Sequence, residues 1–169
     1  MNIGPEIDSE SFDIEDSEDI IGLAKTLVNG RHAGILSTVD ESGRPQVRWM
    51  STLDFNKFPV FFTLTAPDSR KVDQIRLHPA VNWMFFNHDL SLILNLIGHA
   101  RVLTEARTCK RIWKQVEDKS HAYFLKQYSG NSDFVVIETK VEAIECSSPQ
   151  NGLRFNVKPS DLAHAHYPI

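Results

Sequence analysis

The sequence has no apolar run long enough to cross a membrane as a helix, which would need about 20 residues. The longest candidate, residues 90–102, is interrupted by polar and charged residues, among them Asn95 and Arg101. Only two cysteines are present, Cys109 and Cys146, without CxxC spacing or the numbers of a disulfide framework. The N-terminus is acidic where a secretory signal would be basic. These absences predict a cytoplasmic protein that spans no membrane.

Motifs that mark several common kinds of site are also missing. There is no Gly-x-Ser-x-Gly nucleophile elbow and no glycine-rich dinucleotide or P-loop fingerprint. Seven histidines are present, but the pair His164 and His166 has no third ligand at helical spacing, so no metal site is expected. Cys109 falls in the middle of a predicted helix, on its apolar stripe, where a buried and unreactive thiol is expected.

Positive charge is modest and scattered. The chain carries 18 Lys and Arg against 22 Asp and Glu, and eight of the acids fall within residues 1–20, which contain no Lys or Arg. The rest of the chain therefore has a surplus of only four positive charges, so no nucleic-acid partner is expected. Residues 1–15 are acidic and poor in apolar side chains, which predicts a mobile arm before a single domain of residues 16–169.

Strand-like and helical patterns fill that domain. Strands are predicted over residues 33–39, 46–52, 60–65, 80–87, 90–103, 133–146 and 153–157, and helices from residue 16 or 17 to 28, over 70–77, over 105–117 and from 120. Short connections favour antiparallel pairing and a barrel that closes on itself. Gly98 predicts a bulge or a close approach of two strands. Residues 60–64 are apolar on both faces, which predicts a strand inside the sheet rather than at its edge.

A cationic helix start follows the third predicted strand. A proline turn ends the strand, Asp68 or Ser69 is placed to cap the helix of residues 70–77, and Arg70 and Lys71 fall in its first turn. A helix start exposes unpaired N–H groups and the positive end of the helix dipole, so two cations there are unfavourable unless an anion binds. The pattern predicts a phosphate site, although a solvated basic turn has the same composition.

Thr65 lies four residues before Ser69, and Arg48 begins a preceding strand after the turn Gly43-Arg44-Pro45. Together these motifs resemble the flavin-binding core of the pyridoxamine 5′-phosphate oxidase-like split barrels, and more closely their general stress protein branch. The resemblance covers residues 20–145. It implies a mainly β protein with flanking helices, folded as an antiparallel split β-barrel, with FMN as cofactor and FAD as the second candidate.

The resemblance also implies which residues bind the cofactor. They lie on the strand that follows the flavin ring and around the ribityl phosphate: Arg48, Trp49, Met50, Ser51, Leu64, Thr65, Ser69, Arg70 and Lys71. Trp49 and Met50 fit core positions equally well, because alternate residues of a strand point to opposite faces. The family places flavin at the interface of a homodimer, for which Trp49, Trp83 and Trp113 would supply aromatic surface.

The sequence departs from the true pyridoxamine 5′-phosphate oxidases at two points. It has Leu53 where they carry a lysine, and it lacks their C-terminal Arg-x-His. The resemblance therefore implies a flavin-dependent oxidoreductase with another small-molecule electron donor or acceptor, and its catalytic residues stay unassigned. A flavin-binding or flavin-buffering module without turnover, and a relative that binds deazaflavin or haem, share the same motifs.

Overall fold

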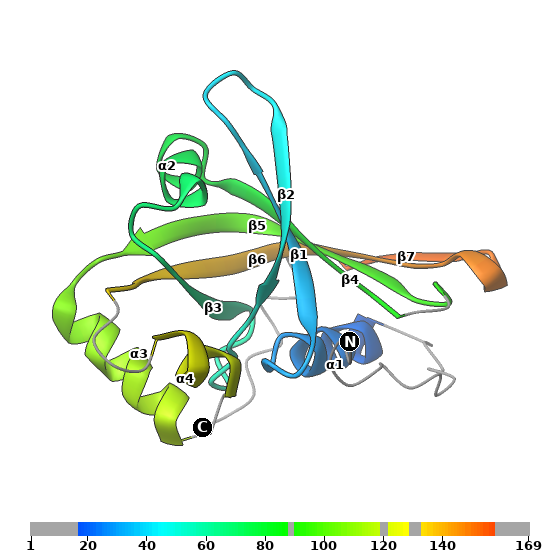
Figure 1. The fold of residues 1–169 in the computed structure, drawn as a ribbon. Helices are drawn as coiled ribbons and strands as arrows, with labels where there is room; N and C mark the ends of the chain where they lie inside the picture. Colours follow the sequence, from blue (N-terminus) through cyan, green and yellow to red (C-terminus); the bar gives the residue numbers. More distant parts are fainter. Residues whose placement is uncertain (1–16, 88–89, 119–121, 129–132, 158–169) are drawn as a thin grey trace.

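A computed structural model describes residues 17–87, 90–118, 122–128 and 133–157 of the chain (Figure 1). In chain order its elements are α1 (Ser17–Leu27), β1 (Ala33–Val39), β2 (Pro45–Ser51), β3 (Val60–Thr65), α2 (Arg70–Leu77), β4 (Ala80–Phe86), β5 (Ile93–Leu103), α3 (Ala106–Asp118), α4 (Ala122–Tyr128), β6 (Val135–Ser148), the 3-10 turn η1 (Pro149–Asn151) and β7 (Leu153–Val157). These bounds confirm the predicted order of strands and helices. None of the helices in the described part of the chain is long and apolar enough to cross a membrane.

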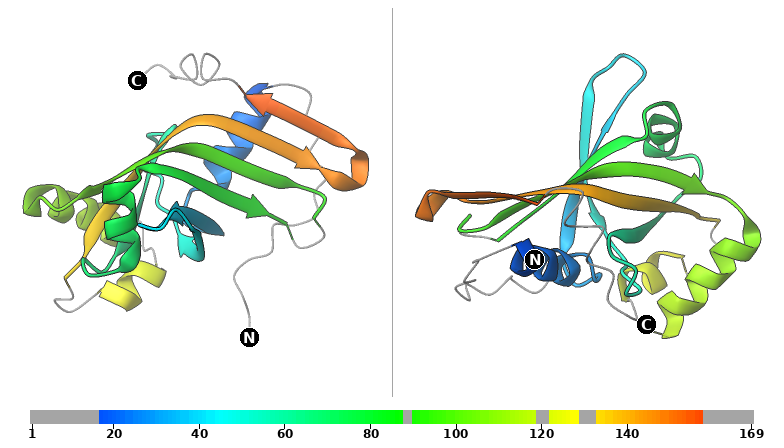
Figure 2. Two further views of the ribbon diagram at one scale, coloured as in Figure 1. Left: turned by 90° about the horizontal axis from the view of Figure 1, so that it is seen from above. Right: turned by 180° about the vertical axis from the view of Figure 1, so that it is seen from behind.

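The seven strands form one antiparallel sheet. Its order is β2-β1-β4-β5-β6-β3, with β7 added to β6. Helices α1, α3 and α4 lie on one side of the sheet and α2 on the other, as the views in Figures 1 and 2 agree. A single bridge between Leu53 and Phe62 links the chain after β2 to β3. The split-barrel prediction is confirmed, but the barrel is not closed by a continuous ladder.

The β1–β2 hairpin projects beyond the rest of the sheet (Figure 1). Its turn is fixed by the Asp40 carboxylate, which accepts hydrogen bonds from the N–H groups of Ser42 and Arg44, both at 2.9 Å. Gly43, between these two residues, has a φ of +79°, a conformation that favours glycine. The predicted hairpin is confirmed. Its strand β1 packs against α2, and Arg48 on β2 reaches Gln74 of α2.

Gly98 lies where β5 crosses β6 most closely. The register between the two strands shifts between Ile97 and Gly98. A Cβ atom at residue 98 would collide with the backbone carbonyl of Lys140. The predicted bulge and close approach are therefore both confirmed.

Two apolar clusters form the interior. The larger joins α1 to β1, β4, β5 and β6, and the smaller joins β3 to α3 and α4. Trp83 is fully buried in the larger cluster, where its indole N–H donates to Thr139 Oγ1 at 3.2 Å. The expectation that Trp83 contributes to a subunit surface is therefore wrong: it faces the core because β4 points its odd-numbered residues inward.

β3 corrects a second expectation. It lies at the end of the sheet order and forms a ladder with β6 only, so the prediction of an interior strand is wrong. Its two faces are nevertheless buried, because Phe61 packs in the larger cluster while Phe62 and Leu64 pack in the smaller. Burial on both faces here comes from covering layers and not from strands on both edges.

Three predictions concern residues outside the described ranges. They are the acidic arm of residues 1–15, the helix start at residue 120, and the pair His164 and His166.

Candidate anion-binding site at the start of α2

α2 begins without the usual side-chain cap. Ser69 occupies the N-cap position, but its hydroxyl makes no capping hydrogen bond. Instead, Ser69 Oγ lies 3.1 Å from Thr65 Oγ1, at the end of β3. The position predicted for the cap is confirmed, whereas the bond expected of its side chain is absent. The N–H groups of the first turn thus lack a partner that N-cap serines usually provide.

Lys71 joins the two hydroxyls. Its Nζ donates to Thr65 Oγ1 at 2.9 Å. Thr65 is buried and Lys71 is half-buried, whereas Arg70 is exposed. Two hydroxyls and an ammonium group therefore meet where β3 ends and α2 begins.

Arg48 reaches the same region from β2. Its Nη1 donates to Thr38 Oγ1 at 2.6 Å and to the Leu36 carbonyl at 3.3 Å, and its Nη2 donates to Gln74 Oε1 at 3.0 Å. Thr38 lies on β1 and Gln74 on α2, so the guanidinium group connects three elements. Neither Thr38 nor Gln74 was among the site residues predicted from the sequence. The signal was available for Gln74, which lies three and four residues after Lys71 and Arg70 and therefore near the same helix face.

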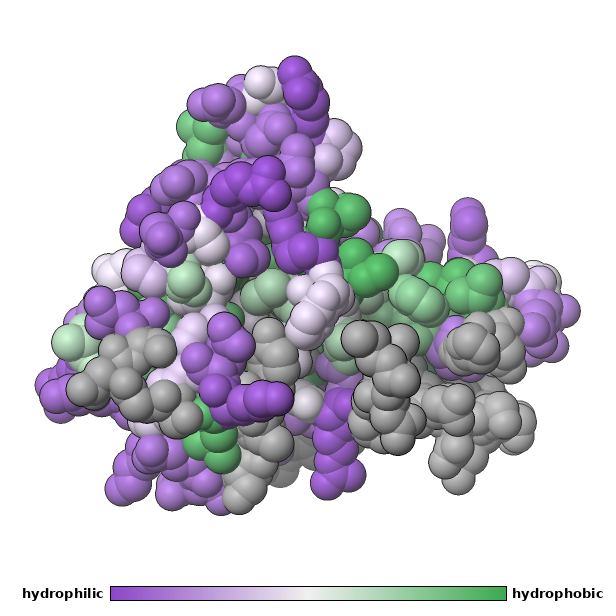
Figure 3. Space-filling view, viewed as in Figure 1, coloured by the Kyte–Doolittle hydropathy of each residue, from purple (hydrophilic) through white to green (hydrophobic). Residues whose placement is uncertain are grey.

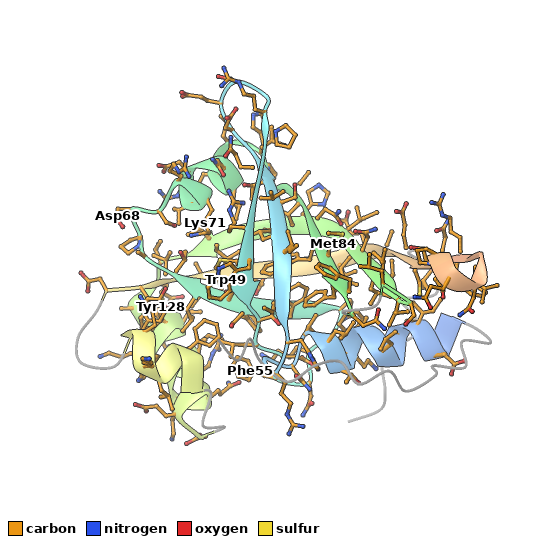
Figure 4. The ribbon with its side chains drawn as sticks, turned by 45° about the vertical axis from the view of Figure 1, so that its right-hand side comes forward. Trp49, Phe55, Asp68, Lys71, Met84 and Tyr128 are labelled. Carbon is orange, nitrogen blue, oxygen red and sulfur yellow. The ribbon has the colours of Figure 1, made fainter. Side chains whose placement is uncertain are left out.

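The three cations of this site act on one another. Burial, and then the charge of Arg70, hold the pKa of Arg48 below its ordinary value. Burial, and then the charges of Arg48 and Arg70, hold the pKa of Lys71 below its ordinary value. Among the described residues no ion pair joins any of the three to a carboxylate. Figure 4 shows Lys71 above Trp49, and Asp68 at the outer end of the turn before α2. Uncompensated positive charge of this kind favours an anion.

The other predicted cofactor residues on β2 separate onto two faces. Met50 is on the same face as Arg48 and packs against the larger core cluster. Trp49 is on the opposite face, with 58% of its surface exposed. The Ser51 carbonyl accepts a hydrogen bond from Thr63 Oγ1 at 2.6 Å. Strand alternation therefore places Trp49 on the face of β2 opposite to Arg48.

Leu64 offers only its backbone to a ligand. Its side chain is buried in the smaller cluster, and its carbonyl accepts a hydrogen bond from the Tyr128 hydroxyl at 3.4 Å. The structure thus brings Arg48, Thr65, Ser69, Arg70 and Lys71 together and leaves Leu64 in the core.

Several apolar side chains are exposed on the outward face of the sheet. Val47 and Trp49 on β2 are 68% and 58% exposed. Cross-strand pairing carries this face from Trp49 through Ile35 to Met84. We name as the outer apolar face the residues Ile35, Val47, Trp49, Met84, Phe86, Ile93 and Ile97. Figure 3 shows hydrophobic surface gathered beside the β1–β2 hairpin and over the strands to its right.

The cysteines are poor nucleophiles. Burial raises the pKa of the Cys109 thiol, and it raises that of Cys146 to about 11. Cys109 is half-buried, so the prediction of a buried thiol there is wrong, whereas its raised pKa agrees with the low reactivity that was predicted. No group of three or more potential metal ligands comes together in the described ranges.

Residues 22–147 match the family model described as pyridoxamine 5′-phosphate oxidase. No curated protein matches the chain. A Clostridium acetobutylicum protein related to general stress protein 26 of Bacillus subtilis superimposes with a TM-score of 0.69, at 16% identity, over 87% of this chain and 99% of its own. An FMN-binding, pyridoxamine 5′-phosphate oxidase-related protein of Nostoc punctiforme gives 0.60, at 12% identity, over 86% and 98%. A haem-binding protein of Mycobacterium smegmatis gives 0.68, at 14% identity, over 89% and 62%. At these identities the likeness shows a shared fold.

Proposed function

Because the chain belongs to the pyridoxamine 5′-phosphate oxidase family, we propose that it binds FMN, with the flavin phosphate at the start of α2. One observation carries the proposal: Arg48, Arg70 and Lys71 converge without a carboxylate partner among the described residues. A phosphate monoester supplies the missing negative charge and accepts several hydrogen bonds at once.

The donor set fits such a phosphate. Two hydroxyls, at Thr65 and Ser69, lie 3.1 Å apart beside the Lys71 ammonium. The start of α2 adds N–H groups that the Ser69 side chain does not cap. Hydroxyls, cations and a helix start are the groups that hold phosphate in proteins. FAD, which carries a diphosphate, is the second candidate.

The side chains of the site are held in place before a ligand arrives. Thr38 and Gln74 orient Arg48, and Thr65 orients Lys71. Preorganised donors lose little conformational entropy on binding, which favours affinity.

Bound flavin would supply the electron transfer, and the chain would supply orientation and the phosphate clamp. We assign the protein as a flavin-dependent oxidoreductase of a small-molecule donor or acceptor. The two cysteines, both free, suit a reducing compartment such as the cytoplasm.

The outer apolar face supports a homodimer. Exposed apolar side chains gathered on one sheet face mark an interaction surface, and a second copy of the chain would cover them. Ile97→Glu places a charge on this face and is expected to convert a dimeric parent to a monomer in light scattering. Leu77→Glu is the matched control, because Leu77 is an exposed leucine on α2 rather than on the sheet. A parent that is monomeric at tens of micromolar would contradict the dimer.

The absorption spectrum of the purified protein tests the cofactor. A flavin spectrum, or saturable FMN binding by the colourless protein, is the expected result. A haem or deazaflavin spectrum would assign the site to another cofactor. No binding at high micromolar FMN, with folding verified by circular dichroism, would refute the proposal. Reduction of the bound flavin by NAD(P)H or another donor, followed by its reoxidation by an electron acceptor, would separate an enzyme from a flavin-binding module.

A further inference from the structure

Gln74 lies behind the phosphate site, on the face of α2 that packs against β1. We propose that Gln74 is a positioning residue that holds Arg48 beside α2 while leaving its positive charge uncompensated. The ligand that this arrangement suits is a phosphate monoester dianion. The inference rests on the proposed function, and it adds a residue that contacts Arg48 rather than the cofactor.

Three side chains form a closed set of hydrogen bonds. The Thr38 hydroxyl donates to Gln74 Oε1 at 2.6 Å, and Arg48 Nη2 donates to the same oxygen at 3.0 Å. Arg48 Nη1 donates to Thr38 Oγ1 at 2.6 Å. Because arginine can only donate, the amide atom facing it is the oxygen. Gln74 is 8% exposed and Thr38 is fully buried, so water has little access to these bonds.

The choice of an amide matters for charge. A buried arginine is most often paired with a carboxylate, which would cancel its charge. The Gln74 carbonyl offers the same acceptor geometry without a negative charge. The guanidinium group of Arg48 therefore remains a cation near Arg70 and Lys71. Burial, and then the neighbouring positive charges, lower the pKa of Arg48 and of Lys71.

Arg48 also keeps donors for a ligand. A guanidinium group has five N–H donors, and its contacts with described residues use three of them. The other donors are available to an anion placed beside α2. Gln74 thus fixes the side chain from behind without consuming its capacity to bind.

A double-mutant cycle tests the inference, with FMN as the probe and inorganic sulfate as a second dianion. Gln74→Leu is expected to weaken FMN binding by about tenfold, within the range for one charge-assisted hydrogen bond. If Gln74 acts through Arg48, then Gln74→Leu should add almost nothing in an Arg48→Ala background. Lys110→Ala, on the exposed face of α3, is the control that changes charge far from this network.

Gln74→Glu is the second test variant, for use if Gln74→Leu does not fold. It keeps the acceptor oxygen and adds only a negative charge. It should weaken FMN and sulfate binding by a similar factor, since the new carboxylate would neutralise Arg48. Unchanged affinity in Gln74→Leu or Gln74→Glu, or additive losses with Arg48→Ala, would overturn the inference. If the parent binds sulfate but not FMN, the proposed function is wrong and the cycle is measured with sulfate. If the parent binds neither, both proposals are wrong.

Discussion

One group of basic side chains gathers at the start of α2 and another lies along α3, and the two differ in how their side chains are held. The site at α2 has three cations, of which Arg48 and Lys71 are partly buried and hydrogen-bonded to Thr38, Gln74 and Thr65. The second group, which we name the α3 basic stripe, consists of Arg107, Lys110, Arg111 and Lys114. Their spacing places all four on one face of α3.

The α3 basic stripe contains more positive charges than the site at α2, but its side chains are less fixed by burial and by hydrogen bonds. Its four side chains are exposed or lie over an open depression, and within the described residues none of them forms an ion pair. Each is free to move and is screened by water and salt. A count of cations alone would therefore rank α3 above α2. Burial and hydrogen bonding of the cations, rather than their number, distinguish a ligand site from a solvated surface.

A third position sharpens the comparison, because there a cation is missing. Leu53, where the true oxidases resembled by this sequence carry a lysine, is fully buried and bridged to Phe62. We expect no useful oxidation of pyridoxamine 5′-phosphate even with FMN bound. One lost charge-assisted contact costs about 1.5 to 3 kcal/mol, or roughly tenfold to a hundredfold. The missing Arg-x-His adds a comparable loss in orienting the substrate, so the deficit should reach about three orders of magnitude.

The measurement is formation of pyridoxal 5′-phosphate under air by FMN-loaded protein. Turnover within about tenfold of a typical enzyme rate of 10 per second would show that other cations replace the missing ones. Arg154, which is exposed on β7, would then be the first residue to mutate in a search for such a cation.

The next largest effect is on cofactor binding itself. Arg70→Ala and Lys71→Ala are each expected to weaken FMN binding by about 1.5 to 3 kcal/mol, the range for a charge-assisted hydrogen bond. Lys110→Ala and Lys114→Ala remove the same charge from the α3 basic stripe and should bind FMN like the parent. Calorimetric titration at low salt measures all four, and the losses at α2 should shrink as salt rises.

Equal losses at the two helices would mean that FMN responds to overall charge and not to a fixed site. Parent-like binding by both α2 variants would place the phosphate elsewhere. Either result would remove the distinction drawn between the two groups.

Local sequence predicted one half of the site and not the other. Ser69, Arg70 and Lys71 are adjacent, so turn chemistry and the helix start were enough to join them, and the resemblance added Thr65, four residues earlier. Thr38 and Gln74 are 36 residues apart, and their contact depends on how the β1–β2 hairpin packs on α2. No local pattern encodes that packing. The resemblance supplied Arg48 as a site residue, but only the structure showed what orients it.

The fold was predictable for a related reason. Alternation and turn residues predicted nearly every strand, and Gly98 predicted the bulge. The position of β3 was mistaken, because an apolar pattern on both faces reports burial and not the number of neighbouring strands. Trp83 was likewise read as surface, although its alternation with Val81 and Phe85 places it inward. The apolar pattern of a strand therefore predicts which of its side chains are buried, whereas the strands that pair with it become known only from the sheet topology.

The smallest expected effect is on the pH dependence of the free energy of unfolding. It can distinguish Lys71 at α2 from the lysines of the α3 basic stripe in protein without cofactor. Burial and the neighbouring cations lower the pKa of Lys71 in the folded protein. In the pH range between that value and the unfolded one, about 10.4, the unfolded chain binds more protons than the folded chain. Stability therefore rises with pH in this range, and at lower pH the charged Lys71 remains a cost to the folded state.

Lys71→Met removes the titrating group, so the parent should gain stability relative to this variant as pH rises from about 7 to about 10. The hydrogen bond from Lys71 to Thr65 contributes to the difference at every pH and does not alter the sign of the change. Denaturant unfolding at several pH values measures this difference in stability. Lys110→Met, on the α3 basic stripe, is the matched control. Saturating sulfate should reduce the effect, because a bound dianion offsets the repulsion among Arg48, Arg70 and Lys71. A constant difference between parent and Lys71→Met across this range would show that Lys71 is as well solvated as the cations of α3, and the contrast between the two helices would then be lost.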